Sequence, residues 1–233
     1  MSMNSRDIIL ASIRRSLGVS GGEAPRRAAV VERLEQHPPG IIPARGKRET
    51  ERLALFRRMM EVASGTVEDV RDAADVPRAV AAFLRAHNLP PRVRRGADPR
   101  LDAMPWDRER TLDVATGPSD GSDLVAMSHA FGAAAETGTL MLVSGADNPT
   151  TLNFLPDTHI VVVRASGIAG DYETLWQRLR ERYGAGAMPR TVNWITGPSR
   201  SADIEQTLIL GAHGPRRLHV IVVGDENGTK SAP

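Results

Sequence analysis

Apolar residues recur along this chain at two spacings, and each spacing predicts a different kind of element. Recurrence every three or four residues predicts helices over 5–17, 50–64, 75–87, 124–135 and 171–183. Short uninterrupted apolar runs predict buried strands at 66–70, 90–94, 112–115, 139–144, 159–163, 191–196 and 218–223. Strands that alternate with helices predict an α/β fold, with a parallel sheet covered on both faces.

The N-terminal segment differs from the rest of the chain. Ser5 can cap a short helix with apolar residues at Ile9, Ile13 and Leu17, and Gly18 can end it. A stretch rich in Gly and Pro follows, so we expect a mobile arm or, alternatively, a helix that packs back on its own domain. The predicted organisation is a helix and linker over 1–47, an α/β domain over 48–226 and a tail over 227–233.

Composition excludes several classes of protein. The chain has 233 residues, of which 41% are hydrophobic and 25% charged, as in ordinary globular proteins. It contains no cysteine, so its own side chains offer no thiolate for a disulfide, a nucleophile or an iron–sulfur cluster. No apolar run approaches the roughly 18 residues of a membrane span, and no secretory signal is evident. We therefore expect a cytoplasmic protein without membrane contact.

Charge is distributed unevenly between the two halves. Residues 1–110 carry 21 Lys and Arg against 15 Asp and Glu, whereas residues 111–233 carry 9 against 13. The basic residues of the first half are interleaved with acidic ones, and the whole chain has only nine aromatic residues for stacking on bases. We expect no nucleic-acid partner.

Three polar segments beside predicted strands are candidates for chemistry. The first contains Glu136, Thr137, Gly138 and Thr139, in which the carboxylate could act as nucleophile or base and the backbone N–H groups could hold an anion. The alternative is an ordinary solvated turn in which Gly138 supplies a backbone dihedral.

The second candidate segment, 197–205, follows a predicted strand. Arg200, flanked by Ser199 and Ser201 and followed by Asp203, could bind a carboxylate or phosphate. In the third segment, His213 lies beside Gly214 and could act as a base or anion ligand. Both segments could also be plain surface turns. We expect all three segments to meet at one pocket, although Glu136 precedes its strand and could lie at the opposite edge.

No cofactor or metal is expected. The chain lacks a Walker A loop, a Gly-x-Gly-x-x-Gly fingerprint and a Gly-x-Ser-x-Gly elbow, and its six histidines do not have the spacing of a zinc site.

Four motifs occur in a recognisable order: AETGTL at 135–140, LPDTHIVVV at 155–163, TGPSRSADIE at 196–205 and GAHGP at 211–215. Together with the segment 6–18, they resemble the lactate utilization protein C family (LutC/YkgG), which is defined by the LUD domain. The resemblance is strong over 124–224 and looser over 50–123. The chain departs from the expected small residues before the Glu-Thr-Gly-Thr turn, where Ser128, His129 and Phe131 add bulk.

The resemblance implies a three-layer α/β/α fold similar to the sugar-phosphate isomerase and CoA-transferase superfamily. It also implies L-lactate oxidation to pyruvate in the cytoplasm, together with partner proteins similar to iron–sulfur and electron-transfer subunits. It supplies no catalytic residue that can be carried over to this chain.

Three functions remain open at this point. The chain could be an accessory subunit that binds partner proteins and a small organic acid, or an enzyme that uses Glu136 on a carboxylate, thioester or sugar-phosphate-like substrate. It could also be a small-molecule sensor without chemistry. The absence of cysteine and of a cofactor motif favours the first and third over autonomous redox catalysis.

Overall fold

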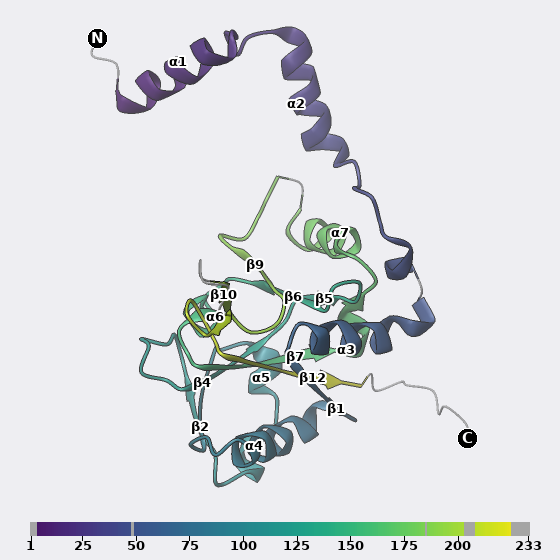
Figure 1. Ribbon diagram of the computed structural model, residues 1–233, viewed down its shortest axis with the longest axis vertical. Helices are drawn as coiled ribbons and strands as arrows, with labels where there is room; N and C mark the ends of the chain where they lie inside the picture. Colours follow the sequence, from purple (N-terminus) through teal and green to yellow (C-terminus); the bar gives the residue numbers. More distant parts are fainter. Residues whose placement is uncertain (1–3, 48, 185, 203–207, 225–233) are drawn as a thin grey trace. The chain divides into compact units, whose positions relative to one another are not determined.

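The computed structural model describes residues 4–47, 49–184, 186–202 and 208–224 (Figure 1). The chain divides into two compact units, which are described separately. One extends to Ile41 and includes the stretch Gly184–Gly186, and the other comprises the rest of the chain.

The N-terminal unit contains two helices, α1 (Ser5–Leu17) and α2 (Ala24–Gln36). Asn4, rather than Ser5, caps α1, because its side chain accepts a hydrogen bond from the N–H of Asp7. Gly18 ends α1 with a positive φ of 63°, as expected for a glycine at that position. Neither helix has a buried residue.

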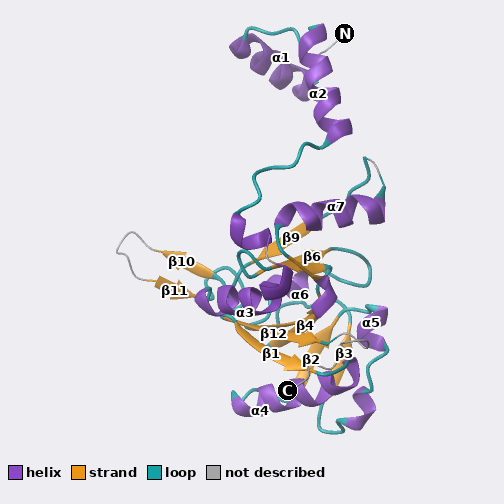
Figure 2. Ribbon diagram, turned by 90° about the vertical axis from the view of Figure 1, so that its right-hand side faces the viewer, coloured by secondary structure: helices purple, strands orange, loops and turns teal. Residues whose placement is uncertain are grey.

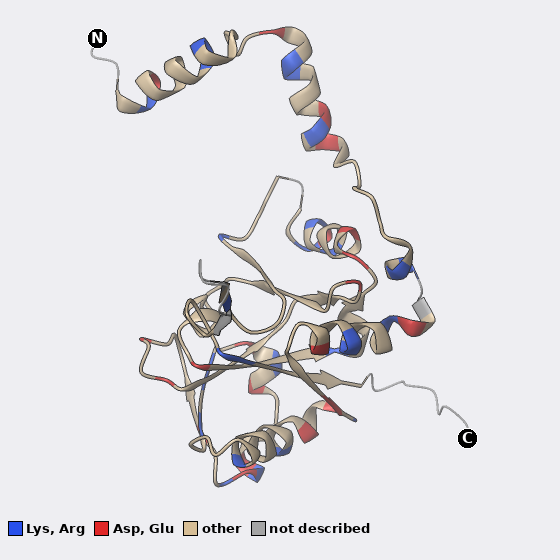
Figure 3. Ribbon diagram, in the orientation of Figure 1, with Lys and Arg blue, Asp and Glu red and all other residues tan. Residues whose placement is uncertain are grey.

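The sequence analysis did not predict α2, which lies inside the expected linker. The glycines and prolines that suggested a linker flank this helix, and the residues between them are mostly Ala, Arg, Glu and Leu, which favour helices. Pro25 lies in the first turn, where a missing N–H costs nothing. Figure 3 shows basic and acidic residues side by side on α2.

The second unit is built on a six-stranded sheet in the order β1-β12-β7-β4-β2-β3. Every neighbouring pair of strands is parallel. Its strands are β1 (Thr66–Val70), β2 (Arg92–Arg95), β3 (Asp113–Thr116), β4 (Val125–His129), β7 (Thr158–Arg164) and β12 (Arg217–Val223).

Helices cover both faces of this sheet, as predicted (Figure 2). One face carries α4 (Val76–Ala86) and α5 (Pro99–Asp102), whose residues Phe83 and Leu101 belong to the same core cluster as Ile160 of β7. The opposite face carries α3 (Arg52–Val62), whose Phe56 and Met60 belong to the same core cluster as Val161 of β7. α6 (Thr151–Phe154) contacts β4 and β7. The prediction of an α/β fold with a mostly parallel sheet is confirmed.

A second, four-stranded sheet lies on the α3 side, and the sequence analysis did not predict it. Its order is β8-β5-β6-β9, and β6 is antiparallel to both of its neighbours. The helix α7 (Tyr172–Tyr183) packs on this sheet through Leu175 and Leu179. The other strands are β5 (Gly132–Ala134), β6 (Thr139–Val143), β8 (Ile168–Ala169) and β9 (Val192–Ile195).

Two sequence predictions are therefore wrong. The segment 124–135 forms β4 and β5 instead of a helix, and the strands at 139–144 and 191–196 belong to the second sheet instead of the parallel one. The second error concerns only which sheet these strands join, which their sequence pattern does not show. The first arises because residues buried on both faces of a strand are apolar or small throughout, so no period of two is visible. Gly132 shows why small residues gather here, since a Cβ on it would lie 2.6 Å from Leu175.

The remaining short elements connect these layers. A hairpin of β10 (Arg200–Ala202) and β11 (Leu208–Leu210) follows β9. In the described part of the chain there are also the 3₁₀ turns η1 (Ala44–Lys47), η2 (Glu49–Glu51), η3 (Ala73–Asp75), η4 (Trp106–Arg108) and η5 (Ala165–Gly167).

Candidate functional site

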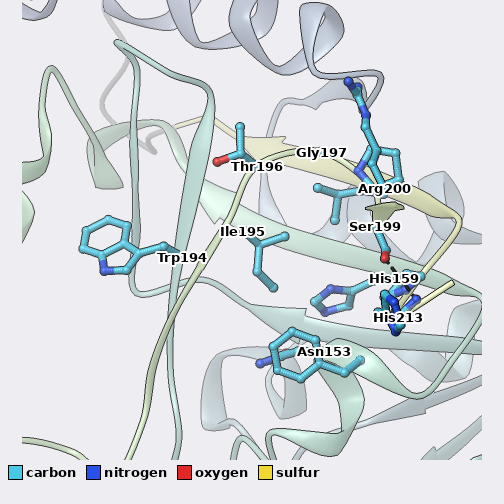
Figure 4. Close-up of a pocket in the computed structure, with 14 residues that line it drawn as sticks. Asn153, His159, Trp194, Ile195, Thr196, Gly197, Ser199, Arg200 and His213 are labelled. Atoms are coloured by element: carbon cyan, nitrogen blue, oxygen red, sulfur yellow. Dashed lines mark hydrogen bonds between the residues drawn. The ribbon is translucent and has the colours of Figure 1, made fainter. Parts of the chain in front are cut away.

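Two of the three predicted segments meet at a cavity of about 290 Å³ (Figure 4). Ser199, Arg200, His213 and Gly214 line this cavity. The N–H of His213 donates to Oγ of Ser199 at 3.3 Å, and the N–H of Ser199 donates to the carbonyl of Pro215 at 2.8 Å. These hydrogen bonds join the segment before β10 to the segment after β11.

The cavity lies at the amino ends of two parallel strands. His159 and Leu218, the second residues of β7 and β12, form part of its wall. Trp194 and Ile195 of β9 and the following Thr196 form another part. The sequence analysis assigned 191–196 to the parallel sheet, so the segment 197–205 that follows would lie at the carboxyl ends of the parallel strands. In the structure β9 belongs to the second sheet, so the loop after it meets the opposite end of the parallel strands.

The side chain of Arg200 binds the end of α3. Its Nη2 donates to the carbonyl of Ala63 and, at 2.7 Å, to Oγ of Ser64, both at the end of α3. Figure 4 shows the side chain of Arg200 extending away from Ser199 and His213. Gly197 allows this segment to approach the end of α3 closely, since a Cβ on it would lie 2.1 Å from the carbonyl oxygen of Ala63. Its φ of 70° also favours glycine.

A buried polar chain that sequence reasoning missed runs into the cavity wall. Oγ of Ser128 donates to Oδ1 of Asn153 at 3.2 Å and lies 3.0 Å from Nε2 of His159. The hydroxyl proton is used by Asn153, so the His159 ring donates through Nε2, and its Nδ1 is a buried acceptor without a partner among the described residues. Burial lowers the pKa of His159 to about 3. A histidine inside an apolar run gave no signal in the sequence.

The Glu136 segment does not line this cavity. Glu136 is buried, its Oε1 accepts from the N–H of Tyr172 at 3.3 Å, and its Oε2 has no partner among the described residues. Gly46 of η1 lies over the carboxyl group, since a Cβ on Gly46 would be 3.3 Å from Oε2. Burial raises the pKa of Glu136, the hydrogen bond from Tyr172 lowers it, and Asp171 raises it further.

A chain of hydroxyl groups joins the Glu136 segment to the cavity. Oγ1 of Thr139 lies 2.7 Å from Oγ1 of Thr137 and 2.7 Å from the hydroxyl oxygen of Tyr172. It also lies 2.6 Å from Oγ1 of Thr196, which lines the cavity. Gly138 presses against α3, because a Cβ on it would lie 2.4 Å from the backbone nitrogen of Met60. Two of the three predicted segments therefore meet at the cavity, and the Glu136 segment is connected to it only through these hydroxyl groups.

The last two predicted residues lie elsewhere. Ser201 is in β10, opposite Ile209, and is not among the residues that line the cavity. Asp203 lies outside the described residues. Within the described ranges, no group of three acidic, His or Cys side chains is arranged to hold a metal ion, and no helix is long and apolar enough to cross a membrane.

These features define an α/β protein with a parallel sheet and, between that sheet and a second, smaller one, a cavity lined by both polar and apolar residues. The sequence model of the LUD domain matches residues 53–223, and the chain belongs to the LUD domain family. A solved structure, that of a DUF162 family protein from Deinococcus radiodurans, is similar with a TM-score of 0.53 and 26% identity. The similarity covers 76% of this chain and 99% of that one.

Curated relatives share most of the chain. The lactate utilization protein C of Geobacillus thermodenitrificans is 29% identical over 239 residues, which cover 96% of this chain and 98% of that protein. The protein of the same name from Geobacillus kaustophilus is 28% identical with the same coverage. That of Bacillus subtilis is 39% identical over 92 residues, or 39% of this chain.

Proposed function

We propose that this protein is a cytoplasmic accessory subunit of an L-lactate utilization system and supports the oxidation of L-lactate to pyruvate by iron–sulfur partner proteins. The observation that carries the proposal is the similarity, over nearly the whole chain, to relatives named lactate utilization protein C.

The chemistry of lactate oxidation supports a division of labour. Removing two electrons from lactate requires a flavin, a nicotinamide or a metal centre as acceptor. This chain has no cysteine to ligate an iron–sulfur cluster and no dinucleotide fingerprint. The redox centres are then supplied by partner subunits, and this chain contributes binding.

Helix α1 offers a surface for such a partner. Ile9, Ile13 and Leu17 recur every four residues, and their exposed fractions are 59%, 49% and 59%. An apolar stripe of this kind is buried when a helix lies in a groove of another protein. We assign the α1 stripe, defined as these three residues, to partner binding.

The cavity at Ser199 is assigned to a small organic acid. The hydroxyl of Ser199, the ring of His213 and the backbone at Gly214 are its polar contacts, with the Thr137–Gly138–Thr139 turn behind Thr196 as support. Arg200 fixes the wall of the cavity to the end of α3 through its hydrogen bond to Ser64. Ser201 and Asp203 belong to the same predicted binding segment of the sequence.

Complementation tests the proposal. Cells that lack this protein should fail to grow on L-lactate and recover when the full chain is supplied, and the tagged chain should co-purify with iron–sulfur proteins. The purified chain should be colourless and should not reduce a dye with lactate unless those partners are added. Dye reduction by the chain alone, or growth on lactate without it, would contradict the proposal.

Glu136 favours a second candidate, an enzyme acting on a carboxylate, thioester or sugar-phosphate-like substrate. A buried carboxyl with one unpartnered oxygen and a raised pKa has the properties of a general base or nucleophile held out of water. The Glu136→Gln variant discriminates between the two. An enzyme would lose growth on lactate with this variant although partners still co-purify, whereas an accessory subunit would keep both.

A further inference from the structure

The parallel sheet contains a topological switch point, at the boundary between β4 and β2. These two strands are neighbours, but the chain leaves β2 toward α5 on one face and leaves β4 toward β5 and β6 on the other. In open α/β sheets the crevice outside the carboxyl ends of such a pair is the usual place for a ligand.

A second cavity, of about 90 Å³, lies at this place. Its wall includes His129, the last residue of β4, and Asp98 and Arg100, which follow β2. Asp147 comes from the loop after β6, and Arg182 from the last turn of α7. A water molecule takes up about 30 Å³ in the liquid, so this cavity has room for about three of them, which is enough for a short organic acid.

Arg100 is held in a fixed orientation in this cavity. Its Nε and Nη2 donate to the two carboxylate oxygens of Asp98 at 2.9 and 2.6 Å, and Asp98 is itself buried. The paired contact fixes the plane of the guanidinium group. Its Nη1 donates to the carbonyl of Ala130 at 3.4 Å, and the side chain, which is 45% exposed, is part of the cavity wall.

His129 presents a hydrogen-bond acceptor. Its Nδ1 lies 2.8 Å from the carbonyl oxygen of Ala130, which can only accept, so Nδ1 carries the proton. Burial, together with the charge of Arg100, lowers the pKa of His129 to about 4, so the ring is neutral. Nε2 is therefore an acceptor, and no hydrogen bond from the described residues reaches it.

The charges around the cavity favour an anion. Arg100 neutralises Asp98, and Arg182 offsets Asp147. Arg164, at the end of the neighbouring β7, adds a positive charge that acts on His129. Within the described residues Arg182 forms no ion pair, so its guanidinium group is available to a ligand.

We propose that this switch-point cavity binds a short 2-hydroxycarboxylate, whose carboxylate contacts Arg182 and Arg100 and whose hydroxyl donates to Nε2 of His129. This site is separate from the cavity at Ser199 and does not rest on the proposed function, because binding to the isolated chain defines it.

Calorimetric titration of the full chain with lactate, propionate and inorganic phosphate tests the proposal. Lactate should bind more tightly than propionate, which lacks the hydroxyl, and more tightly than phosphate. Arg182→Gln should weaken lactate binding about tenfold, and Arg180→Gln, on the same helix but outside the cavity, should not. Asp147→Asn should tighten binding, because it removes the opposing negative charge.

His129 is tested by the preference for the hydroxyl group. His129→Phe should abolish the difference between lactate and propionate while propionate binds as before. Should this variant not fold, the ¹⁵N signal of Nε2 in the unaltered chain gives the same information, since lactate should shift it and propionate should not.

Three results would overturn the proposal: no binding of lactate at millimolar concentration, equal effects of Arg182→Gln and Arg180→Gln, or an Nε2 signal that lactate leaves unmoved. The titration uses the isolated chain, so its result does not depend on growth on lactate or on co-purification with partner proteins. Failure of lactate binding and failure of the proposed function can therefore be told apart.

Discussion

Three histidines in the sheet are buried and neutral. Burial lowers the pKa of His129 to about 4, of His159 to about 3 and of His219 to about 4, from an ordinary value of 6.5. His219 stacks on Phe83 with ring centres 4.0 Å apart, and His159 belongs to the chain through Ser128. The sequence analysis noted His129 only as added bulk before the Glu136 turn and did not single out His159 or His219, because burial of a polar ring is not visible in a sequence.

These histidines predict that the protein loses stability in mild acid. Below pH 6.5 these histidines become protonated in the unfolded chain, whereas in the folded chain they stay neutral down to about pH 4. Each ring therefore lowers the free energy of unfolding by up to about 1.4 kcal/mol for each unit by which the pH falls. Urea midpoints should be constant above neutrality and fall steadily from pH 6.5 to 4.5. The slope should persist in His213→Gln, whose side chain is exposed, and a flat profile would contradict the prediction.

Gly138 is the second residue whose role can be measured. Its φ of 67° and its close approach to the backbone of Met60 leave no place for a methyl group. Gly138→Ala should lower the free energy of unfolding by about 2 kcal/mol or more, because the helix α3 must move. Gly184→Ala is the control, with a φ of 86° and no atom within 4 Å of a Cβ. Equal losses in the two variants would mean that backbone strain alone matters.

At the scale of elements, prediction succeeded where the flanking residues end an element clearly. β1 is formed by the predicted residues 66–70, and α7 begins after Asp171, whose carboxylate accepts from the N–H of Thr174 at 2.8 Å. Prediction failed for 124–135, where burial on both faces hides the period of a strand. The position of the candidate site was wrong for a different reason: β9 was predicted as a strand but assigned to the parallel sheet, and that assignment decided where Ser199 would lie.

The α1 stripe gives a prediction for this scale. Ile13→Glu should prevent co-purification with partner proteins, because a carboxylate cannot be buried in an apolar groove without a large cost. The melting temperature should not change, because Ile13 is half-exposed. Ile41→Glu is a matched control, since this isoleucine is 98% exposed and lies outside both N-terminal helices. Partner binding that survives Ile13→Glu would remove the stripe from the interface.

For the whole molecule, the N-terminal unit should be the first part lost to a protease. α1 and α2 have no buried residue, and non-helical segments at 18–23 and 37–43 border α2. Proteinase K should therefore leave a fragment that begins between residues 19 and 47, identifiable by its mass. A first stable fragment that keeps α1 but has lost β12 would contradict the predicted division at residue 47.

The pairing of β1 with β12 has a consequence for synthesis on the ribosome. β1 is among the first strands of its sheet to emerge, yet its only neighbour is the last strand, β12, which also completes one side of β7. At ordinary elongation rates β1 waits on the order of ten seconds for this neighbour. During that interval the edges of β1 and β7 that later bind β12 are unpaired, so they are open to pairing with the edge strands of another copy.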